Sequence, residues 1–320
     1  MDNDILMTIV KVVVVLLVFS ALAGFTTYIE RKVLAFMQRR LGPIHVGPFG
    51  LLQIAADGIK LFTKEDFVPQ NANKLIFMIA PVITAATAFI AMSAVPFVPG
   101  VIISDVNVGI LFVLGVMATG LYGPLLAGMS QSNKWGLLGG ARTAIQLLSY
   151  EVVTGLSILA PIMMVGSLSL IDINNFQSGG IQYWLIWSQP VAFFLFLIAG
   201  FAETNRTPFD LLEHEAEIVS GYATEYSGMR WGMFFIGEYA NLFTISFLIS
   251  LMFLGGFNDL GFIPGAIAIL LKVALLIFVF LWTRASWPHV RPDQLMWLCW
   301  KVLMPIALVN IVITGIVMMV

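Results

Sequence analysis

The feature that most constrains this chain is a series of apolar runs, each about long enough to cross a lipid bilayer. A spanning helix needs about 20 apolar residues, and such runs occupy 5–28, 75–98, 107–128, 144–166, 185–202, 232–256, 264–282 and 302–320. Hydrophobic residues make up 59% of the 320 residues and charged residues only 11%, against about 25% charged residues in soluble domains. The sequence therefore predicts an all-α membrane protein with about eight transmembrane helices, folded as a single polytopic domain over residues 1–320.

The basic residues predict how these helices are oriented. Every Lys and Arg except Lys11 and Lys272 falls in or beside the first, third, fifth or seventh connection. Basic residues accumulate on the cytoplasmic side of membrane proteins, so we expect those connections in the cytoplasm and both termini on the outer, periplasmic side. We find no transit-peptide pattern, which favours a bacterial inner membrane over a mitochondrial inner membrane.

The first connection contains an amphipathic segment. Polar residues recur at helical spacing on one face and apolar residues on the other, namely Gln53, Asp57, Lys60 and Lys64 against Leu51, Ala55, Ile59 and Phe62. Such a helix of about four turns either lies in the lipid headgroup layer or roofs the entrance to a cavity at the membrane surface. The pattern alone leaves both interpretations open.

Ionisable residues inside the apolar runs indicate function most strongly. A charge at the bilayer centre costs at least ~2.5–3.5 kcal/mol on insertion scales, so such residues usually face partners or water and mark a pathway. Four of them lie in or at the end of the fourth to seventh runs: Glu151, Glu203, Glu238 and Lys272. Arg142 cannot neutralise Glu151 on one helix, because nine residues turn by about 900° and place the two side chains on opposite faces. Interhelix ion pairs are the alternative to a pathway.

The connection between the fifth and sixth helices is long and acidic. From Glu203 to Glu225 it carries six carboxylates, and Arg206 is the basic residue among them. In a confined and partly wet cleft, crowding and desolvation favour the protonated form of a carboxyl group, and His214 titrates near neutral pH. We therefore interpret this loop as a proton relay or a charge-sensitive switch.

The composition excludes several kinds of redox site. Cys299 is the only cysteine, so neither an intrachain disulfide nor a cysteine-based metal or iron–sulfur site can form. The three histidines lie in polar stretches, whereas haem ligation within a membrane cytochrome needs histidines inside the helices. The net charge of −2 gives no argument for a nucleic-acid partner.

Four stretches together carry a family resemblance. They are AETNRTPFDLLEHEAEIVSGYATEYSGMRWGMFFIGEY, ERKVLAFMQRRLGP with GLLQIAADGIKLFTKE, LLSYEV, and RASWPHVRPDQLMWLCWKVLMP. They closely resemble the H subunit of the proton-pumping NADH:quinone oxidoreductase, respiratory complex I, and the resemblance covers essentially the whole chain.

This resemblance implies a membrane subunit that docks the hydrophilic arm of the complex and builds much of the quinone-access chamber. The first helix, the amphipathic helix and the sixth span are expected to frame an opening to the lipid. The positions that match residues lining or neighbouring the chamber, where quinone binds, are Glu30, Arg31, Arg40, Asp57 and Phe234. Those that match the proton relay leading to the pumping machinery are Glu151, Glu203, Glu213, Glu215, Glu217, Glu225, Glu238, Arg142 and Arg206.

The resemblance also implies what the chain binds. Quinone, as ubiquinone or menaquinone, is the expected substrate, and no flavin, haem, iron–sulfur cluster or metal is expected on this subunit. The expected partners are complex I subunits of the membrane arm, quinone-site subunits of the hydrophilic arm, and membrane lipid. The chain departs from the usual family pattern at Ile44, His45, Ile54 and Pro292, which puts in question the fine contacts at the cavity rim and with partner subunits.

Two alternatives belong to other classes of protein. A related membrane subunit of a membrane-bound hydrogenase or another ferredoxin-linked ion pump would look similar without binding quinone. A stand-alone secondary transporter often shows internal repeats, and we find no repeat at the residue level. The large charged cytoplasmic connections suit docking of a soluble partner better than transport alone.

Overall fold

The computed structural model describes residues 2–97, 102–212, 215–259 and 263–319, and their regular structure is helical. Seven segments are long and apolar enough to cross a membrane, which confirms the predicted all-α membrane fold. They are α1 (Asp2–Met37), α3 (Lys74–Met92), α4 (Gly109–Gly120) continued by α5 (Tyr122–Ser130), α6 (Lys134–Val165), α11 (Gly228–Phe253), α12 (Gly265–Ser286), and α13 (Pro292–Leu298) continued through the π-helical turn η4 (Cys299–Leu303) into α14 (Met304–Met319).

The remaining elements are short. They are η1 (Pro48–Gly50), α2 (Gln53–Thr63), α7 (Leu170–Phe176), η2 (Ile181–Tyr183), α8 (Leu185–Ser188), α9 (Pro190–Glu203), α10 (Glu215–Ile218) and η3 (Gly221–Ala223). The fifth apolar run is thus divided between α8 and α9, and α9 has 14 residues. The described part of the chain gives seven helices of spanning length and one shorter apolar helix, so the count of eight spans stays a prediction.

The break in the fifth run has a local cause. Pro190 is the first residue of α9, where its missing N–H removes no helical hydrogen bond. Gln189 before it is buried and is held by α14, because its Nε2 donates to Thr314 Oγ1 at 2.9 Å and its Oε1 accepts from Asn310 Nδ2 at 3.0 Å. The polar residue that interrupts the run is therefore satisfied by another helix.

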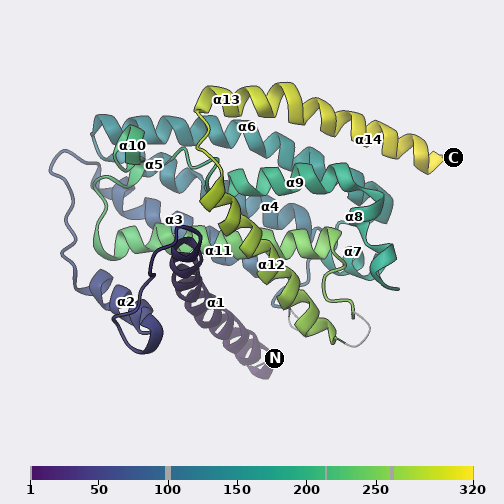
Figure 1. Cartoon of the computed structure of the whole chain (residues 1–320), viewed down its shortest axis with the longest axis horizontal. Helices are drawn as coiled ribbons and strands as arrows, with labels where there is room; N and C mark the ends of the chain where they lie inside the picture. Colours follow the sequence, from purple (N-terminus) through teal and green to yellow (C-terminus); the bar gives the residue numbers. More distant parts are fainter. Residues whose placement is uncertain (1, 98–101, 213–214, 260–262, 320) are drawn as a thin grey trace.

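Helix α11 forms the centre of the bundle. In its most apolar stretch 83% of the residues are buried, against 17% in the α13–α14 segment and 18% in α1, so these two segments present most of their surface outward. Figure 1 shows α11 running through the middle of the molecule, with α6 and α9 on one side of it and α12 crossing it. The main apolar core lies around α11, and a second, smaller core packs at the end where α11 begins.

Two helices extend beyond the apolar runs that predicted them. Helix α6 starts at Lys134, where the Asn133 side chain accepts a hydrogen bond from Trp135 N at 3.1 Å, so Arg142 lies within the helix rather than in a connection. Helix α1 continues to Met37, about two turns past the predicted span. Glu30 and Arg31 therefore project from a continuous helix, which fixes the direction of each side chain.

The amphipathic helix predicted in the first connection is α2, and it is shorter than the expected four turns. Its apolar side chains Ile59 and Phe62 are 65% and 74% exposed, while Asp57 on the polar face bonds to Arg31 of α1. Gln53 and Asp57 of the polar face therefore turn toward the bundle, whereas the Lys60 side chain is 65% exposed and Ile59 and Phe62 turn outward. This orientation suits a helix that roofs a cavity and meets lipid or a partner on its other side.

Lys272, the basic residue inside the seventh apolar run, has two partners in the structure. Its Nζ donates to the carbonyl of Gly256 at 2.7 Å and lies 4.5 Å from the centroid of the Trp184 ring. Both groups belong to connections at the end of the bundle where α11 stops. Lys272 thus ties α12 to these connections.

Candidate functional site

A cavity of ≈ 230 Å³ lies between α1, α2 and α11. One wall is polar, because Arg31 Nη1 donates to Asp57 Oδ2 at 2.6 Å and Gln53 Nε2 donates to the other oxygen of Asp57 at 3.0 Å. The rest of the lining is largely apolar or aromatic: Ala23, Gly24, Ile54, Leu61, Trp231, Phe235, Ile236 and Tyr239. A ligand with a polar head and an apolar tail suits such a lining. Ligand pockets usually enclose about 300–1,000 Å³, and the volume of this cavity lies below that range.

Ile54 of α2 lines this cavity and packs on α1. A Cβ added at Gly24 on α1 would lie 3.1 Å from Ile54 Cγ2. The absence of a side chain at Gly24 therefore lets α2 pack closely on α1.

A buried ion cluster adjoins the cavity and shares Tyr239 with it. The Glu30 carboxylate accepts hydrogen bonds from Arg206 Nη1, from Arg284 Nη1 and from the Tyr239 hydroxyl, the last at 2.8 Å. Glu30 is 5% exposed and Arg206 3% exposed, and the guanidinium of Arg206 lies 4.4 Å from the centroid of the Tyr239 ring. We call these four residues, from α1, α11, α12 and the connection after α9, the Glu30 cluster.

The charge of Arg206 is held in place by this cluster. Burial alone would lower the pKa of its guanidinium, but the Glu30 carboxylate, together with Tyr239 and Glu238, raises the pKa above its usual range. Arg206 therefore stays protonated although it is almost fully enclosed. Because Glu238 contributes to the pKa of Arg206, the Glu30 cluster is electrostatically linked to Glu238, the residue of α11 that precedes Tyr239.

A second group of acids lies where α9 ends against α6. Glu203, the last residue of α9, is 4% exposed, and Tyr150 and Glu151 of α6 are its neighbours. The Glu203 Oε1 atom and the Tyr150 hydroxyl are both buried, and the two side chains interact with each other. A buried carboxyl group is costly unless it has a polar partner, and Tyr150 is the partner that the structure gives Glu203.

Three further acids bridge separate elements. Glu217 of α10 accepts from Arg142 Nη1 of α6 at 2.7 Å, so Arg142 does find its partner on another element. Glu225 accepts from Asn133 Nδ2 at 2.9 Å, and Glu238 of α11 accepts from the Tyr222 hydroxyl at 3.4 Å. Some of the predicted charges are thus interhelix pairs.

The aromatic residues of the acidic loop anchor it to the bundle. The Tyr226 ring stacks on Phe77 with centroids 4.1 Å apart, and its hydroxyl donates to the Phe77 carbonyl at 3.0 Å. Burial raises the pKa of Tyr226 to about 12, so the hydroxyl remains a donor at neutral pH. Phe234 packs on both Tyr226 and Tyr222, with centroids 5.0 and 5.1 Å apart.

Not every predicted residue lies at the cavity. Phe234 is 1% exposed and faces the second core, while its neighbour Phe235 lines the cavity. Arg40 is exposed after α1 and bonds to Gln38, away from the lining residues. The backbone of Glu215 begins α10, and Glu213 lies outside the described residues.

Arg284, Tyr239 and Tyr150 of the site were not predicted from the sequence. Arg284 follows an apolar run in the same way as other basic residues, and nothing in its neighbours points to Glu30, which is 254 positions away. The two tyrosines each adjoin an acidic residue that was predicted, Glu238 and Glu151. This adjacency was the only indication in the sequence that the two tyrosines belong to the site. It is a weak indication, because neighbouring residues on a helix point in different directions.

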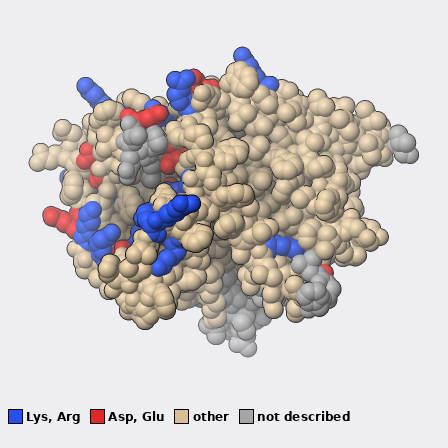
Figure 2. Space-filling view, in the orientation of Figure 1, with Lys and Arg blue, Asp and Glu red and all other residues tan. Residues whose placement is uncertain are grey.

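The charged residues gather at one end of the molecule. Figure 2 shows Lys, Arg, Asp and Glu over the side that carries α2 and α10, while most of the remaining visible surface is uncharged. This separation is typical of a helix bundle whose charged end lies outside the hydrocarbon layer. Among the described residues, no group of three or more His, Cys, Asp or Glu side chains could hold a metal ion.

Fold and site together define a polytopic membrane protein with an ion cluster buried beside an amphiphilic cavity. Residues 10–315 match the family model described as NADH dehydrogenase. The chain is 76% identical to the H subunit of the NADH-quinone oxidoreductase of a Nitratiruptor species, with 98% of each chain covered. It is 74% identical to that of Wolinella succinogenes, with 99% of each covered, and 68% identical to that of Sulfurimonas denitrificans, with 98% of each covered. The chain belongs to this family, the H subunits of the NADH-quinone oxidoreductase, respiratory complex I.

Proposed function

We propose that this chain forms much of a quinone-binding chamber and couples quinone reduction to proton translocation through its buried acids. The observation that carries the proposal is the cavity between α1, α2 and α11, whose lining residue Tyr239 also bonds to Glu30. An apolar tail would occupy the part beside Trp231 and Phe235, and the headgroup would approach the Arg31–Asp57 pair.

The small volume of the cavity supports the view that other subunits complete the chamber. At ≈ 230 Å³ it is too small for a whole isoprenoid quinone, so the chamber requires further walls. Those walls would come from quinone-site subunits of the hydrophilic arm, which dock on the charged end, and other membrane-arm subunits would cover outward-facing helices. We place the charged end in the cytoplasm and both termini in the periplasm of a bacterial inner membrane, following the distribution of basic residues.

The coupling follows from charge. A quinone that gains two electrons must gain two protons, and until the protons arrive the chamber holds added negative charge. Two charges a few ångströms apart in a protein interior interact by several kcal/mol, so the guanidinium groups of the Glu30 cluster would respond first. Arg206 is balanced by both Glu30 and Glu238, and a change at Glu30 therefore alters the field at Glu238. Glu203 and Glu151 would take up or release protons as that field changes.

The high identity with subunits of the NADH-quinone oxidoreductase favours this function over that of a hydrogenase-type or ferredoxin-linked pump subunit. The charged end, on which soluble subunits could dock, likewise favours a complex over a stand-alone transporter.

The test separates binding from relay in the intact complex. Asp57→Asn is expected to raise the KM for quinone, because it loosens the polar wall of the cavity. Glu203→Gln and Glu151→Gln are expected to lower both quinone reduction and proton pumping at least about tenfold, a modest loss for a proton-transfer group, while assembly persists. Asp105→Asn, an exposed carboxylate between α3 and α4, is the matched control.

The measurement is inhibitor-sensitive quinone reduction by complex reconstituted in liposomes, with a pH-sensitive dye reporting proton uptake. Wild-type turnover and pumping in both Glu203→Gln and Glu151→Gln would refute the relay. An unchanged KM for Asp57→Asn would refute the placement of the headgroup.

A further inference from the structure

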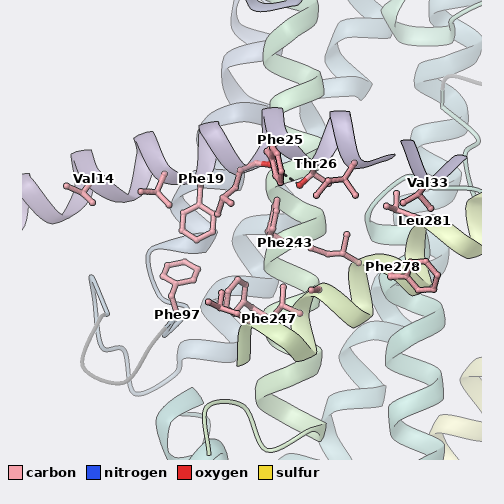
Figure 3. Close-up of a pocket in the computed structure, with 17 residues that line it drawn as sticks. Val14, Phe19, Phe25, Thr26, Val33, Phe97, Phe243, Phe247, Phe278 and Leu281 are labelled. Carbon is pink, nitrogen blue, oxygen red and sulfur yellow. Dashed lines mark hydrogen bonds between the residues drawn. The ribbon is translucent and has the colours of Figure 1, made fainter. Parts of the chain in front are cut away.

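A second cavity lies on another face of α1, away from the cavity described above. It is a groove of ≈ 520 Å³ between α1, α11 and α12. Its floor is aromatic and buried, and Figure 3 shows Phe19 of α1 facing Phe97, with Phe243 and Phe247 of α11 beside them. Phe19 and Phe97 have centroids 4.4 Å apart, and Phe97 and Phe247 5.1 Å apart.

The groove opens outward along its rim. Val14 and Val18 of α1 and Leu270 and Phe278 of α12 are 50%, 47%, 55% and 46% exposed. These residues belong to membrane-spanning segments, so the solvent at the open side is hydrocarbon or a neighbouring apolar helix.

The lining accepts hydrocarbon and little else. Among the described lining residues, Thr26 is the only side chain with a hydroxyl, and that hydroxyl donates to the Leu22 carbonyl of its own helix at 2.8 Å. A quinone headgroup has two carbonyl oxygens that need donors, and these lining side chains offer none to it. The groove therefore suits a saturated or unsaturated chain and not a quinone ring.

The length of the groove matches one leaflet of a bilayer. On α12 it is lined by a stripe at helical spacing, from Leu270 through Ala274 and Ile277 to Leu281. Eleven residue rises make this stripe about 16 Å long, and half of a bilayer's hydrocarbon core is about 15 Å.

The headgroup level is marked where the stripe ends. Trp282 and Trp287 are 56% and 63% exposed, and exposed tryptophans concentrate at the interface between hydrocarbon and headgroups. Arg284 continues the same helical stripe after Leu281, and its side chain is 35% exposed. One of its five N–H donors is used by Glu30, which leaves donors for a phosphate.

We propose that this groove is a binding site for one phospholipid, with an acyl chain lying on the aromatic floor and the phosphate at Arg284. Charge complementarity at Arg284 and the leaflet-length stripe identify the occupant as a phospholipid. The proposal does not depend on the proposed quinone chamber, although Arg284 places the lipid phosphate in contact with the Glu30 cluster.

The test uses the purified complex and a phospholipid that carries a diazirine in its acyl chain. The complex is loaded with the probe, freed of unbound lipid by gel filtration in detergent, irradiated and digested for mass spectrometry. The expected labels fall on α1 and α12 residues that line the groove. Ala274→Trp, which fills the groove from its rim, is expected to lower this label about tenfold, the change that corresponds to ~1.4 kcal/mol of binding free energy.

Leu275→Trp is the matched control, because Leu275 is 60% exposed and lies outside the lining; it is expected to retain the label. Val18→Trp fills the groove from α1 and replaces Ala274→Trp if that variant fails to assemble. The proposal would be overturned if all label is lost during gel filtration, or if Ala274→Trp and Leu275→Trp are labelled equally. It would also be overturned if an isoprenoid quinone displaces the probe but phospholipid does not. A photoreactive residue at 274 that crosslinks to another polypeptide would overturn it as well.

Discussion

Replacing Glu30 with Gln tests whether the Glu30 cluster holds the bundle together. The substitution preserves the size of the side chain but removes the negative charge that faces Arg206 and Arg284. Arg206 is 3% exposed, so its charge would be left in the interior without compensation. Removing one partner of a buried ion pair typically lowers the free energy of unfolding by about 3–5 kcal/mol.

The structure ranks the expected losses in the free energy of unfolding among the residues of the cluster. The Arg284 side chain is 35% exposed, against 2% for Arg206. Because water already solvates part of the Arg284–Glu30 ion pair, Arg284→Gln is expected to lower the free energy of unfolding by only about 1 kcal/mol. The exposed Arg291–Asp293 pair, with side chains 66% and 70% exposed at 3.5 Å, provides the control. Asp293→Asn should change the free energy of unfolding by less than about 0.5 kcal/mol.

The assay is the half-life of the folded chain at a fixed temperature, followed by pulse proteolysis of the detergent-solubilised complex. Large membrane assemblies usually unfold irreversibly, so a rate is the proper measure of stability. If about 3 kcal/mol appears in the unfolding barrier, Glu30→Gln unfolds about a hundredfold faster than the wild type. The double variant Glu30→Gln/Arg206→Gln should lose less than the sum of the single variants, because the buried guanidinium is removed together with its carboxylate.

A half-life of Glu30→Gln within about threefold of that of Asp293→Asn would refute this reasoning, since threefold is below ~1 kcal/mol. Strict additivity in the double variant would refute it too, because residues joined by an ion pair must show an interaction energy.

Two further predictions use the same assay. Gly128→Leu should destabilise the chain by about 1–3 kcal/mol, because a Cβ at Gly128 would lie 2.8 Å from the Gly140 nitrogen and push α5 away from α6. Gly155→Ala should stabilise the chain by about 0.5–1 kcal/mol, because Gly155 lies in the interior of α6 and an added Cβ would meet nothing within 4 Å. Equal effects of the two substitutions would contradict the close packing of α5 on α6. Lys272→Met should cost about 1–3 kcal/mol, because it leaves the Gly256 carbonyl without its donor, and an unchanged half-life would show that this hydrogen bond contributes nothing.

Apolar run length was enough to predict the helical membrane fold, because each spanning segment must satisfy its own backbone hydrogen bonds in lipid. The ends of the helices were less predictable for the same reason. Helicity continues past the hydrocarbon layer wherever the backbone bonds can continue, so α6 includes Arg142 and α1 includes Glu30. Helix α9 is short because Pro190 starts it.

The partners within the candidate site were the part that sequence could not supply. Glu30 is 176 residues from Arg206 and 254 residues from Arg284, and no local spacing links residues so far apart. The acids could be singled out one by one, because each is costly in an apolar run. Which of them are paired, as Glu217 is with Arg142, depends on how the helices cross.

The charges near the proposed quinone chamber are not balanced one to one. At the polar wall Arg31 and Lys60 both face Asp57, with Lys60 Nζ 3.9 Å from the carboxylate, and in the Glu30 cluster Arg206 and Arg284 face Glu30, with Glu238 as a second anion acting on Arg206. An excess positive charge beside an amphiphilic cavity would stabilise a reduced, negatively charged headgroup more than the neutral oxidised one. Glu238 also acts on the charge of Arg206. Negative charge in the cavity would therefore compete with Glu238 for Arg206, and we propose this competition as the physical link between the cavity and the proposed relay.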